Sequence, residues 1–187
     1  SLTSTRNIIT LCWSLLVSLT NQKLGTGTMM DRALKINVIG GGPGGLYFSL
    51  LMKLDDPRHE ITIFERNRAD DTFGFGVVFS DETLANFMGQ DPETYLLIRE
   101  AFAYWDEIEV RYKGERIRSG GHGFAGMSRQ KLLNILQGRC RDVGIQMNFE
   151  TEIVDLEQYR EADVVLGSDG VNSMVRESYK DTFKPSI

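Results

Sequence analysis

Between positions 35 and 64, the hydrophobic and polar positions predict a strand, a helix and a second strand. The apolar run Lys35–Ile39 is typical of a strand buried in a parallel sheet, and Ile61–Phe64 repeats that pattern. Four residues between the two runs recur at i, i+3, i+4 and i+7 and predict one face of a helix: Tyr47, Leu50, Leu51 and Leu54. This order predicts a βαβ unit, in which a helix crosses over between two parallel strands.

Further along the chain, helical and alternating patterns follow one another. Residues 81–107 predict helices with a break at Pro92. Three aromatic residues near their end are expected in the core, with contact to a substrate as the alternative: Phe102, Tyr104 and Trp105. Residues 108–119 alternate between apolar and polar positions, which predicts a β-hairpin. For Phe73–Ser80, where glycines and aromatic residues alternate, a bulged strand or hairpin and a close approach to a flat ligand are equal alternatives.

The last part of the chain predicts one helix and two strands. Ser128 is placed to cap a helix that ends near Gly138 or Gly144 and whose apolar stripe is Leu132, Leu133 and Leu136. Residues 145–149 and 162–166 predict strands. The whole pattern predicts an α/β fold, a Rossmann-like domain with a parallel sheet, crossover helices and an inserted β-hairpin.

The segment Gly40–Gly45 stands directly between the first predicted strand and its helix. In a nucleotide-binding βαβ unit, one glycine permits the tight turn, a second lets the backbone approach a pyrophosphate, and a third permits close packing of helix and strand. Gly40, Gly42 and Gly45 stand at these three positions. We therefore predict a diphosphate site made of Gly40, Gly42, Pro43, Gly44 and Gly45. A glycine-rich loop without a binding function is the alternative.

Glu65, which lies 20 residues beyond Gly45, is the second part of this motif. A carboxylate at this distance accepts hydrogen bonds from ribose hydroxyls and repels a 2′-phosphate. The helix dipole adds only about 0.3–1 kcal/mol at an exposed site, so backbone N–H groups must supply much of the affinity for phosphate. These residues predict a dinucleotide ligand, either FAD or NAD.

The overall composition is that of an ordinary globular protein, with 187 residues of which 41% are hydrophobic and 25% charged. A net charge of −5 argues against a nucleic acid or an anionic membrane surface as the main partner. The two cysteines, Cys12 and Cys140, lack the spacing of a metal or redox motif, which favours a reduced, cytoplasmic protein. Two histidines and no His/Cys cluster lead us to expect no metal site.

Residues 1–30 differ from the rest, because they contain Arg6 and Lys23 but no acidic residue. Their apolar stretch Ile8–Leu19 is shorter than the roughly 20 residues that a membrane-spanning helix needs. We expect an upstream extension outside the fold, with the folded domain covering residues 31–187. A membrane-surface anchor and a secretion signal, for which no A-x-A cleavage pattern follows, are the alternatives.

The segment Gly167–Arg176 carries the most specific signal. Asp169-Gly170 follows the last predicted strand, and Ser173 and Arg176 stand three residues apart beyond it. This arrangement resembles the DG motif of the single-component FAD-dependent aromatic hydroxylases, the para-hydroxybenzoate hydroxylase group. Further segments stand in the order that this family shows: Gly40–Gly45, Glu65-Arg66, and Arg129 before a leucine-rich helix.

Within this group, three segments resemble the aromatic acyl-CoA hydroxylases, such as salicylyl-CoA 5-hydroxylase and anthraniloyl-CoA monooxygenase: Asp70–Asp81, Phe102–Asp106 and Ser119–Phe124. The resemblance covers about residues 34–187. The chain departs from the family in having no Gly-Asp dipeptide, which in a later segment binds the ribityl chain. We therefore expect an N-terminal fragment of a longer enzyme, which binds FAD weakly and hydroxylates nothing by itself.

The resemblance implies a cofactor role for each matching residue. In this assignment the FAD pyrophosphate is held by Gly40, Gly42 and Gly45, the adenosine ribose by Glu65, the adenine by Arg66, the ribityl-pyrophosphate stretch by Arg129, and the flank of the cofactor by Asp169 and Gly170. The family also links the last motif to the nicotinamide donor. Arg176 would fix the turn by pairing with an acid.

The implied reaction is hydroxylation of an aromatic ring, with an aromatic substrate (a CoA thioester), O₂ and NADH or NADPH as partners. Reduced flavin would react with O₂ at C4a, and the resulting C4a-hydroperoxyflavin would transfer a hydroxyl group to the ring. This chemistry needs no protein nucleophile, so no catalytic residue is predicted. An NAD-linked dehydrogenase that shares only the βαβ unit and a non-catalytic nucleotide-binding remnant are the alternatives.

Overall fold

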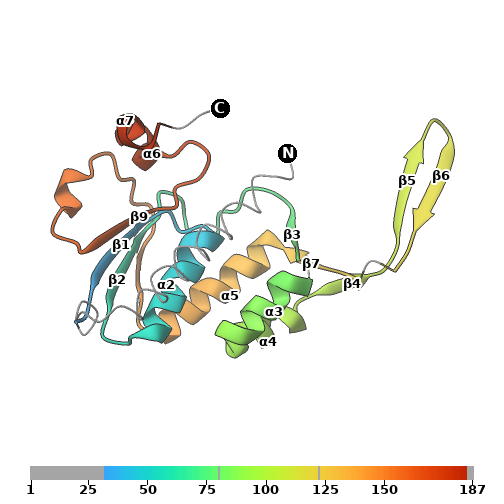
Figure 1. Cartoon of the computed structure of the whole chain (residues 1–187), viewed down its shortest axis with the longest axis horizontal. Helices are drawn as coiled ribbons and strands as arrows, with labels where there is room; N and C mark the ends of the chain where they lie inside the picture. Colours follow the sequence, from blue (N-terminus) through green and yellow to red (C-terminus); the bar gives the residue numbers. More distant parts are fainter. Residues whose placement is uncertain (1–31, 80, 122, 185–187) are drawn as a thin grey trace. The chain divides into compact units, whose positions relative to one another are not determined.

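The computed structural model describes residues 32–79, 81–121 and 123–184. The chain divides into two compact units: a first unit that contains residues up to 69 and from 138 onwards, and a second unit of residues 70–137. Figure 1 shows the parallel strands of the first unit and the long β-hairpin of the second. The extension expected at residues 1–30 lies outside the described residues.

A parallel sheet of four strands forms the centre of the first unit in its described residues (Figure 1). Its strands are β1 (Lys35–Ile39), β2 (Glu60–Phe64), β8 (Gln146–Asn148) and β9 (Val164–Gly167), in the order β8-β2-β1-β9. β1 is parallel to both of its neighbours, β2 and β9, and every residue of β1 after Lys35 is buried. Its continuous apolar sequence follows from this position, because a central parallel strand is covered on both faces. The predicted parallel sheet is confirmed.

Helix α2 (Pro43–Asp55) connects β1 to β2 and is the predicted crossover helix. Its predicted apolar face is only partly buried, because Leu50 is fully buried whereas Leu54 is 41% exposed. The buried residues of the helix are Gly45, Leu46, Phe48, Ser49 and Leu50. The helix takes this rotation because Gly45 packs against the strand, and Ser49 one turn later donates its hydroxyl to Gly45 O at 2.7 Å.

Helix α5 (Arg129–Asp142) crosses the division between the two units. Ser128 caps the helix, as predicted, by accepting a hydrogen bond from Lys131 N at 3.2 Å. The helix continues through Gly138, and Gly144 follows its end with φ 79°, a conformation that favours glycine. Of the two predicted ends, Gly144 is therefore the correct one.

Three short elements complete the described part of the first unit: the 3-10 helix η2 (Glu157–Tyr159) and the helices α6 (Met174–Ser178) and α7 (Lys180–Phe183). Cys140, in the last turn of α5, is buried and donates from Sγ to Leu46 O of α2 at 3.5 Å. This contact joins the end of α5 to the crossover helix.

The described residues of the second unit form an antiparallel sheet, a separate hairpin and two helices that precede α5. The elements are β3 (Gly76–Phe79), α3 (Asp81–Gln90), α4 (Pro92–Glu100), β4 (Ala103–Trp105), β5 (Ile108–Tyr112), β6 (Glu115–Ser119) and β7 (Phe124–Ser128). β7 lies between β3 and β4, and β5 pairs with β6. The predicted hairpin is confirmed, and part of Phe73–Ser80 forms a paired strand.

The helical prediction for residues 81–107 is wrong beyond Glu100, where α4 ends and a strand follows. The prediction of a buried aromatic cluster is also wrong for Tyr104 and Trp105, which are 64% and 40% exposed. Phe102 is half-buried, and its ring centroid lies 5.3 Å from that of Phe79. β4 lies at the edge of its sheet in the described residues, and all three of its residues are exposed, so it does not bury its aromatic side chains.

We predict an unusually acidic carboxyl group in the turn between α2 and β2. Hydrogen bonds from the Arg58 guanidinium and from Arg58 N lower the pKa of Asp56 from 3.8 to about 2. Because the folded chain favours the carboxylate, this contribution to stability is present above pH 3.8 and is lost as the pH falls towards 2. An NMR titration of the Asp56 carboxyl should show a midpoint at about 2.

The variant Arg58→Ala should raise this midpoint towards 3.8, because the guanidinium is lost while the hydrogen bond from the backbone N–H of residue 58 is kept. Arg160→Ala is the matched control, because Arg160 pairs with Glu157 and is not a partner of Asp56. A midpoint near 3.8 in the unchanged chain would contradict the hydrogen-bonded geometry.

Candidate functional site

The glycine turn leads from β1 into α2. Gly40 has φ 106°, a conformation that glycine adopts without strain, and its N–H donates to Phe64 O at 2.8 Å. A Cβ atom on Gly40 would lie 2.4 Å from Ser168 O. The turn is thus held between the end of β2 and the chain that follows β9.

Glu65 lies beside this turn, and its carboxylate is held by donors on both oxygens. Gly41 N donates to Glu65 Oε2 at 2.6 Å, while Asn67 donates to Oε1 from N at 2.8 Å and from Nδ2 at 2.6 Å. A carboxylate has about four acceptor positions, so these three donors leave one free for a further hydroxyl or N–H group. Asn67 was not among the predicted site residues.

Gly42 and Gly45 differ in what surrounds them. A Cβ atom on Gly45 would lie 2.3 Å from Gly40 O and 3.1 Å from Val38 Cγ1, so α2 packs on β1 only without a side chain there. A Cβ atom on Gly42 would meet no atom within 4 Å. Gly42 is the N-cap of α2 without a side-chain cap, and Pro43 follows it. The start of α2 therefore presents open backbone.

Asp169 and Gly170 form the turn that follows β9. Asp169 Oδ1 accepts a hydrogen bond from Ser173 Oγ at 2.5 Å, and Oδ2 accepts one from Met174 N at 2.6 Å. Gly170 has φ 85°. The carboxylate therefore orders its own turn and the start of α6. The backbone of Asp169 faces the glycine turn, because its Cα would lie 2.8 Å from a Cβ atom on Gly40.

The expectation that Arg176 pairs with an acid is wrong. Its guanidinium donates to the carbonyl oxygen of Val171. Its backbone N–H donates to Ser173 Oγ at 3.0 Å, which makes Ser173 the N-cap of α6. The nearby carboxylate of Asp169 is bound by donors of its own turn, and the partner of the Arg176 guanidinium is a backbone carbonyl.

Ser168 is a residue of this site that the sequence reasoning missed. Its hydroxyl lies 2.7 Å from Gly40 O and 3.1 Å from Ile39 O, and its N–H donates to Ile39 O at 2.8 Å. Ser168 directly follows β9, and the carboxyl ends of parallel strands meet at one edge of a sheet. That rule was the available signal for its place beside the glycine turn.

The structure brings the glycine turn, Glu65 and Asp169 together where β1, β2 and β9 end. Arg66 is exposed directly after Glu65. Arg129 belongs to the second unit, where it is half-buried and its N–H donates to Phe75 O at 3.3 Å. The cofactor roles expected for Arg66 and Arg129 stay predictions.

Within residues 32–79, 81–121 and 123–184, no group of three or more His, Cys, Asp or Glu side chains is placed to hold a metal ion. None of the helices in this part of the chain is long and apolar enough to cross a bilayer. His122, in the loop between β6 and β7, lies outside the described residues.

Comparison with curated proteins finds relatives among the monooxygenases, although no family model matches the chain. Over 153 residues the chain is 46% identical to a salicyloyl-CoA 5-hydroxylase from Streptomyces sp, which covers 82% of the chain and 30% of that protein. Over 143 residues it is 29% identical to the 3-hydroxy-4-methyl-anthranilyl-[aryl-carrier protein] 5-monooxygenase of Streptosporangium sibiricum, covering 76% of the chain and 40% of that protein. The chain thus spans well under half of these relatives.

Solved structures share the fold. The tetrameric form of 2-methyl-3-hydroxypyridine-5-carboxylic acid oxygenase has a TM-score of 0.68 at 22% identity, over 79% of this chain and 42% of that one. CtdE in complex with FAD has a TM-score of 0.64 at 19% identity, over 79% and 41%. Taken with the curated relatives, these likenesses show that the chain has the fold of part of the FAD-containing monooxygenases and is similar in sequence to part of the length of the hydroxylases named above.

Proposed function

We propose that this chain is the FAD-binding part of an NAD(P)H-dependent flavoprotein monooxygenase that hydroxylates an aromatic ring. One observation carries the proposal. The open backbone at Gly42 directly follows Gly41, whose N–H donates to Glu65, a carboxylate held in place with one acceptor position to spare. The reaction is taken from the relative named for the 5-hydroxylation of salicyloyl-CoA.

The residues of the site fit the adenosine diphosphate half of FAD. A phosphate oxygen needs N–H donors and close access. The uncapped start of α2 offers backbone N–H groups, and the space beside Gly42 is open. The free acceptor position of Glu65 suits a ribose hydroxyl. The same carboxylate would repel the 2′-phosphate of NADP, which favours FAD or NAD over NADP at this position.

Bound FAD would supply the redox and oxygen chemistry, so the chain's own residues have to bind and orient it. The backbone of Gly40–Gly45 would hold the pyrophosphate, and Glu65 would fix the ribose. Asp169 would act as a positioning residue, because it orders the turn beside Gly40 through its own hydrogen bonds. We assign Arg66 to the adenine and Arg129 to the ribityl-pyrophosphate stretch.

The finer parts of the proposal concern the partners of the whole enzyme. We infer NADH or NADPH as electron donor, O₂ as co-substrate and an aromatic acyl thioester as substrate. Both relatives described above are named for aromatic acyl groups on a carrier, which is CoA in one and an aryl-carrier protein in the other. We place the enzyme in the cytoplasm, because its two cysteines lack the spacing of a metal or redox motif.

The experiment is a titration of the chain with FAD, followed by the change in flavin fluorescence. The chain should bind FAD, and Glu65→Gln should weaken binding about tenfold, because the ribose loses a hydrogen bond to a charged acceptor. Glu60→Gln is the matched control, since Glu60 is an exposed acid at the start of β2. It should leave FAD affinity unchanged.

Two results would contradict the proposal. Binding of NAD⁺ but not FAD would favour the dehydrogenase alternative, and equal FAD affinity in both variants would remove Glu65 from the site. For the reaction, a longer protein that contains this chain is mixed with FAD, NADH or NADPH, O₂ and salicyloyl-CoA. A hydroxylated thioester is expected, and its absence from FAD-loaded protein would contradict the monooxygenase assignment.

A further inference from the structure

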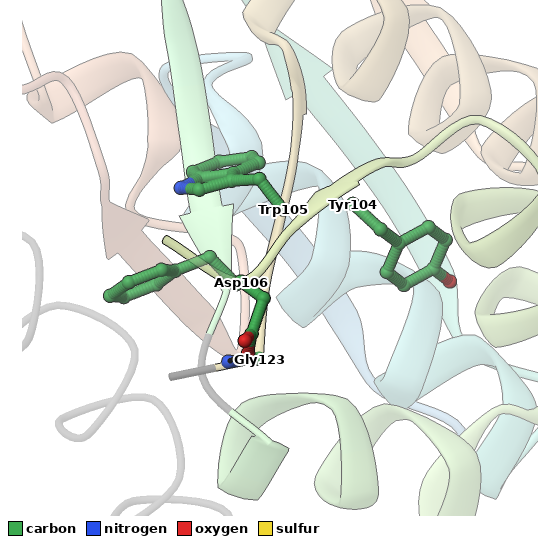
Figure 2. A pocket seen from close by; sticks show the side chains of 5 residues that line it. Tyr104, Trp105, Asp106 and Gly123 are labelled. Carbon is green, nitrogen blue, oxygen red and sulfur yellow. Dashed lines mark hydrogen bonds between the residues drawn. The ribbon is translucent and has the colours of Figure 1, made fainter. Parts of the chain in front are cut away.

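A hollow in the second unit is lined mostly by aromatic side chains (Figure 2). Its volume of about 480 Å³ falls within the range of about 300–1,000 Å³ that is typical of small-ligand sites. The residues that line it are Tyr104, Trp105, Asp106, Gly123 and Phe124. The rings of Trp105 and Phe124 are stacked, with their centroids 5.7 Å apart and their planes at 25°. A flat ring could extend this stack, because Trp105 is 40% exposed.

Asp106 ties this hollow to the base of the hairpin formed by β5 and β6. Its Oδ2 accepts a hydrogen bond from Gly121 N at 3.0 Å, and its Oδ1 accepts one from Gly123 N at 3.3 Å. Both glycines have positive φ, 78° and 58°, so the loop can turn sharply around the carboxylate. The chain entering the hairpin and the chain leaving it therefore meet at the hollow.

One face of the hairpin is basic, although the whole chain has a net charge of −5. Cross-strand pairing places Glu109 opposite Arg118 and Arg111 opposite Arg116, on the same face. Glu109 pairs with Arg111 at 2.5 Å and with Arg118 at 2.9 Å. Arg116 adds a third guanidinium directly opposite Arg111, and like charges in this position repel each other. A bound anion would relieve that repulsion.

We propose that the hollow and this basic face together bind the nucleotide end of a coenzyme A thioester. The inference rests on the proposed function, because it assigns a site to the carrier of the aromatic substrate. The adenine would stack on Trp105 and Phe124, and phosphate groups would contact Arg116 and Arg118. Arg116 and Arg118 stand two residues apart on β6, a spacing of about 7 Å, so both can contact phosphate groups of one ligand.

This adenine site is separate from the one assigned to FAD. The adenosine of FAD is assigned to the glycine turn of the first unit, whereas the hollow and the hairpin belong entirely to the second unit. Coenzyme A differs from FAD in carrying a 3′-phosphate, and a basic strip of three guanidinium groups favours the ligand with more phosphates. Its pantetheine arm would remain free to carry the aromatic acyl group elsewhere.

The test follows the indole N–H resonance of Trp105 by NMR in FAD-loaded chain. The sequence contains two tryptophans, so the variant Trp13→Phe assigns the signal. Coenzyme A, adenosine 3′,5′-bisphosphate and pantetheine are added in separate titrations under reducing conditions. The first two should shift the Trp105 resonance, with weaker affinity at higher salt, and pantetheine should not.

Variants separate the two parts of the site. Phe124→Leu should weaken coenzyme A binding about tenfold, because a base loses part of its aromatic stack. Arg116→Gln, at an exposed position, should weaken it about twofold to fivefold. Lys131→Gln is the matched control, because it removes the same charge from an exposed position of the same unit and should change nothing.

Three outcomes would overturn the inference: an unmoved Trp105 resonance in chain that holds FAD, an equal shift with pantetheine alone, or release of FAD by the bisphosphate. Each of these outcomes is read in chain that holds FAD, whereas the proposed function fails if FAD itself does not bind. Because flavin binding is measured in the same samples, the two failures are distinguishable.

Discussion

Gly45→Ala is expected to destabilise the chain by about 3 kcal/mol or more, which is at the upper end of what overpacking of a core costs. The added Cβ would lie 2.3 Å from Gly40 O and 2.4 Å from Ser168 Oγ. Gly40 O belongs to a tight turn and cannot rotate away as a flexible side chain could. Relief requires α2 to move off β1, which would expose the fully buried Leu46 and Val38.

Urea unfolding of FAD-free chain, followed by circular dichroism, measures this effect. Gly138→Ala is the matched control, because it makes the same chemical change inside α5 where a Cβ would meet no atom within 4 Å. It should stabilise the chain by up to about 1 kcal/mol through helix propensity. An unfolding midpoint for Gly45→Ala that equals that of the unchanged chain would show that α2 does not pack on β1 as described.

The first strand, turn and helix of the first unit could be predicted from sequence because the constraints on them are local. β1 is buried on both faces, so its apolar run is uninterrupted, and the turn at its end needs a positive φ that favours glycine. Both constraints act within a few residues of each other. The strand, the turn and the helix could therefore be found without knowing what they pack against.

Features that depend on distant partners could not be found in this way. β4 exists because Tyr104 pairs with Ala125 of β7, far along the chain, and no local pattern distinguishes it from the end of a helix. Ser168 contacts Gly40 across more than a hundred residues. The rotation of α2 is set by the packing of Gly45 rather than by its most regular apolar stripe.

Arg176 illustrates a different limit of sequence reasoning. A basic residue near an acidic one predicts an ion pair, but the Asp169 carboxylate is bound by Ser173 Oγ and Met174 N of its own turn. Short loops satisfy such groups locally, since backbone N–H donors are close and need no side-chain ordering. The arginine then takes a backbone carbonyl, Val171 O. Asp169 thus shapes the site through its own hydrogen bonds. Gly42 differs, because it has no side chain and leaves the space beside it open.

Gly42→Ala is therefore expected to weaken FAD binding tenfold or more while leaving the fold intact. A Cβ at this position meets no protein atom within 4 Å, so the methyl group would project into the space that we assign to the pyrophosphate. A phosphate oxygen held away from the N–H groups at the start of α2 would lose hydrogen bonds of about 1.5–3 kcal/mol each, which corresponds to at least about tenfold in affinity. The loss of stability should stay near 1 kcal/mol, the usual effect of a poorer N-cap residue.

FAD titration and urea unfolding of the same Gly42→Ala sample separate these two effects. Gly89→Ala is the control, because Gly89 lies in α3 of the second unit and a Cβ there would also meet no atom within 4 Å. It should leave FAD affinity unchanged. Gly45→Ala should lose stability because protein atoms already occupy the position of the added Cβ. For Gly42→Ala the main effect should be weaker FAD binding. Unchanged FAD affinity in Gly42→Ala would show that the pyrophosphate does not bind at this turn. It would thereby contradict the function proposed for the turn.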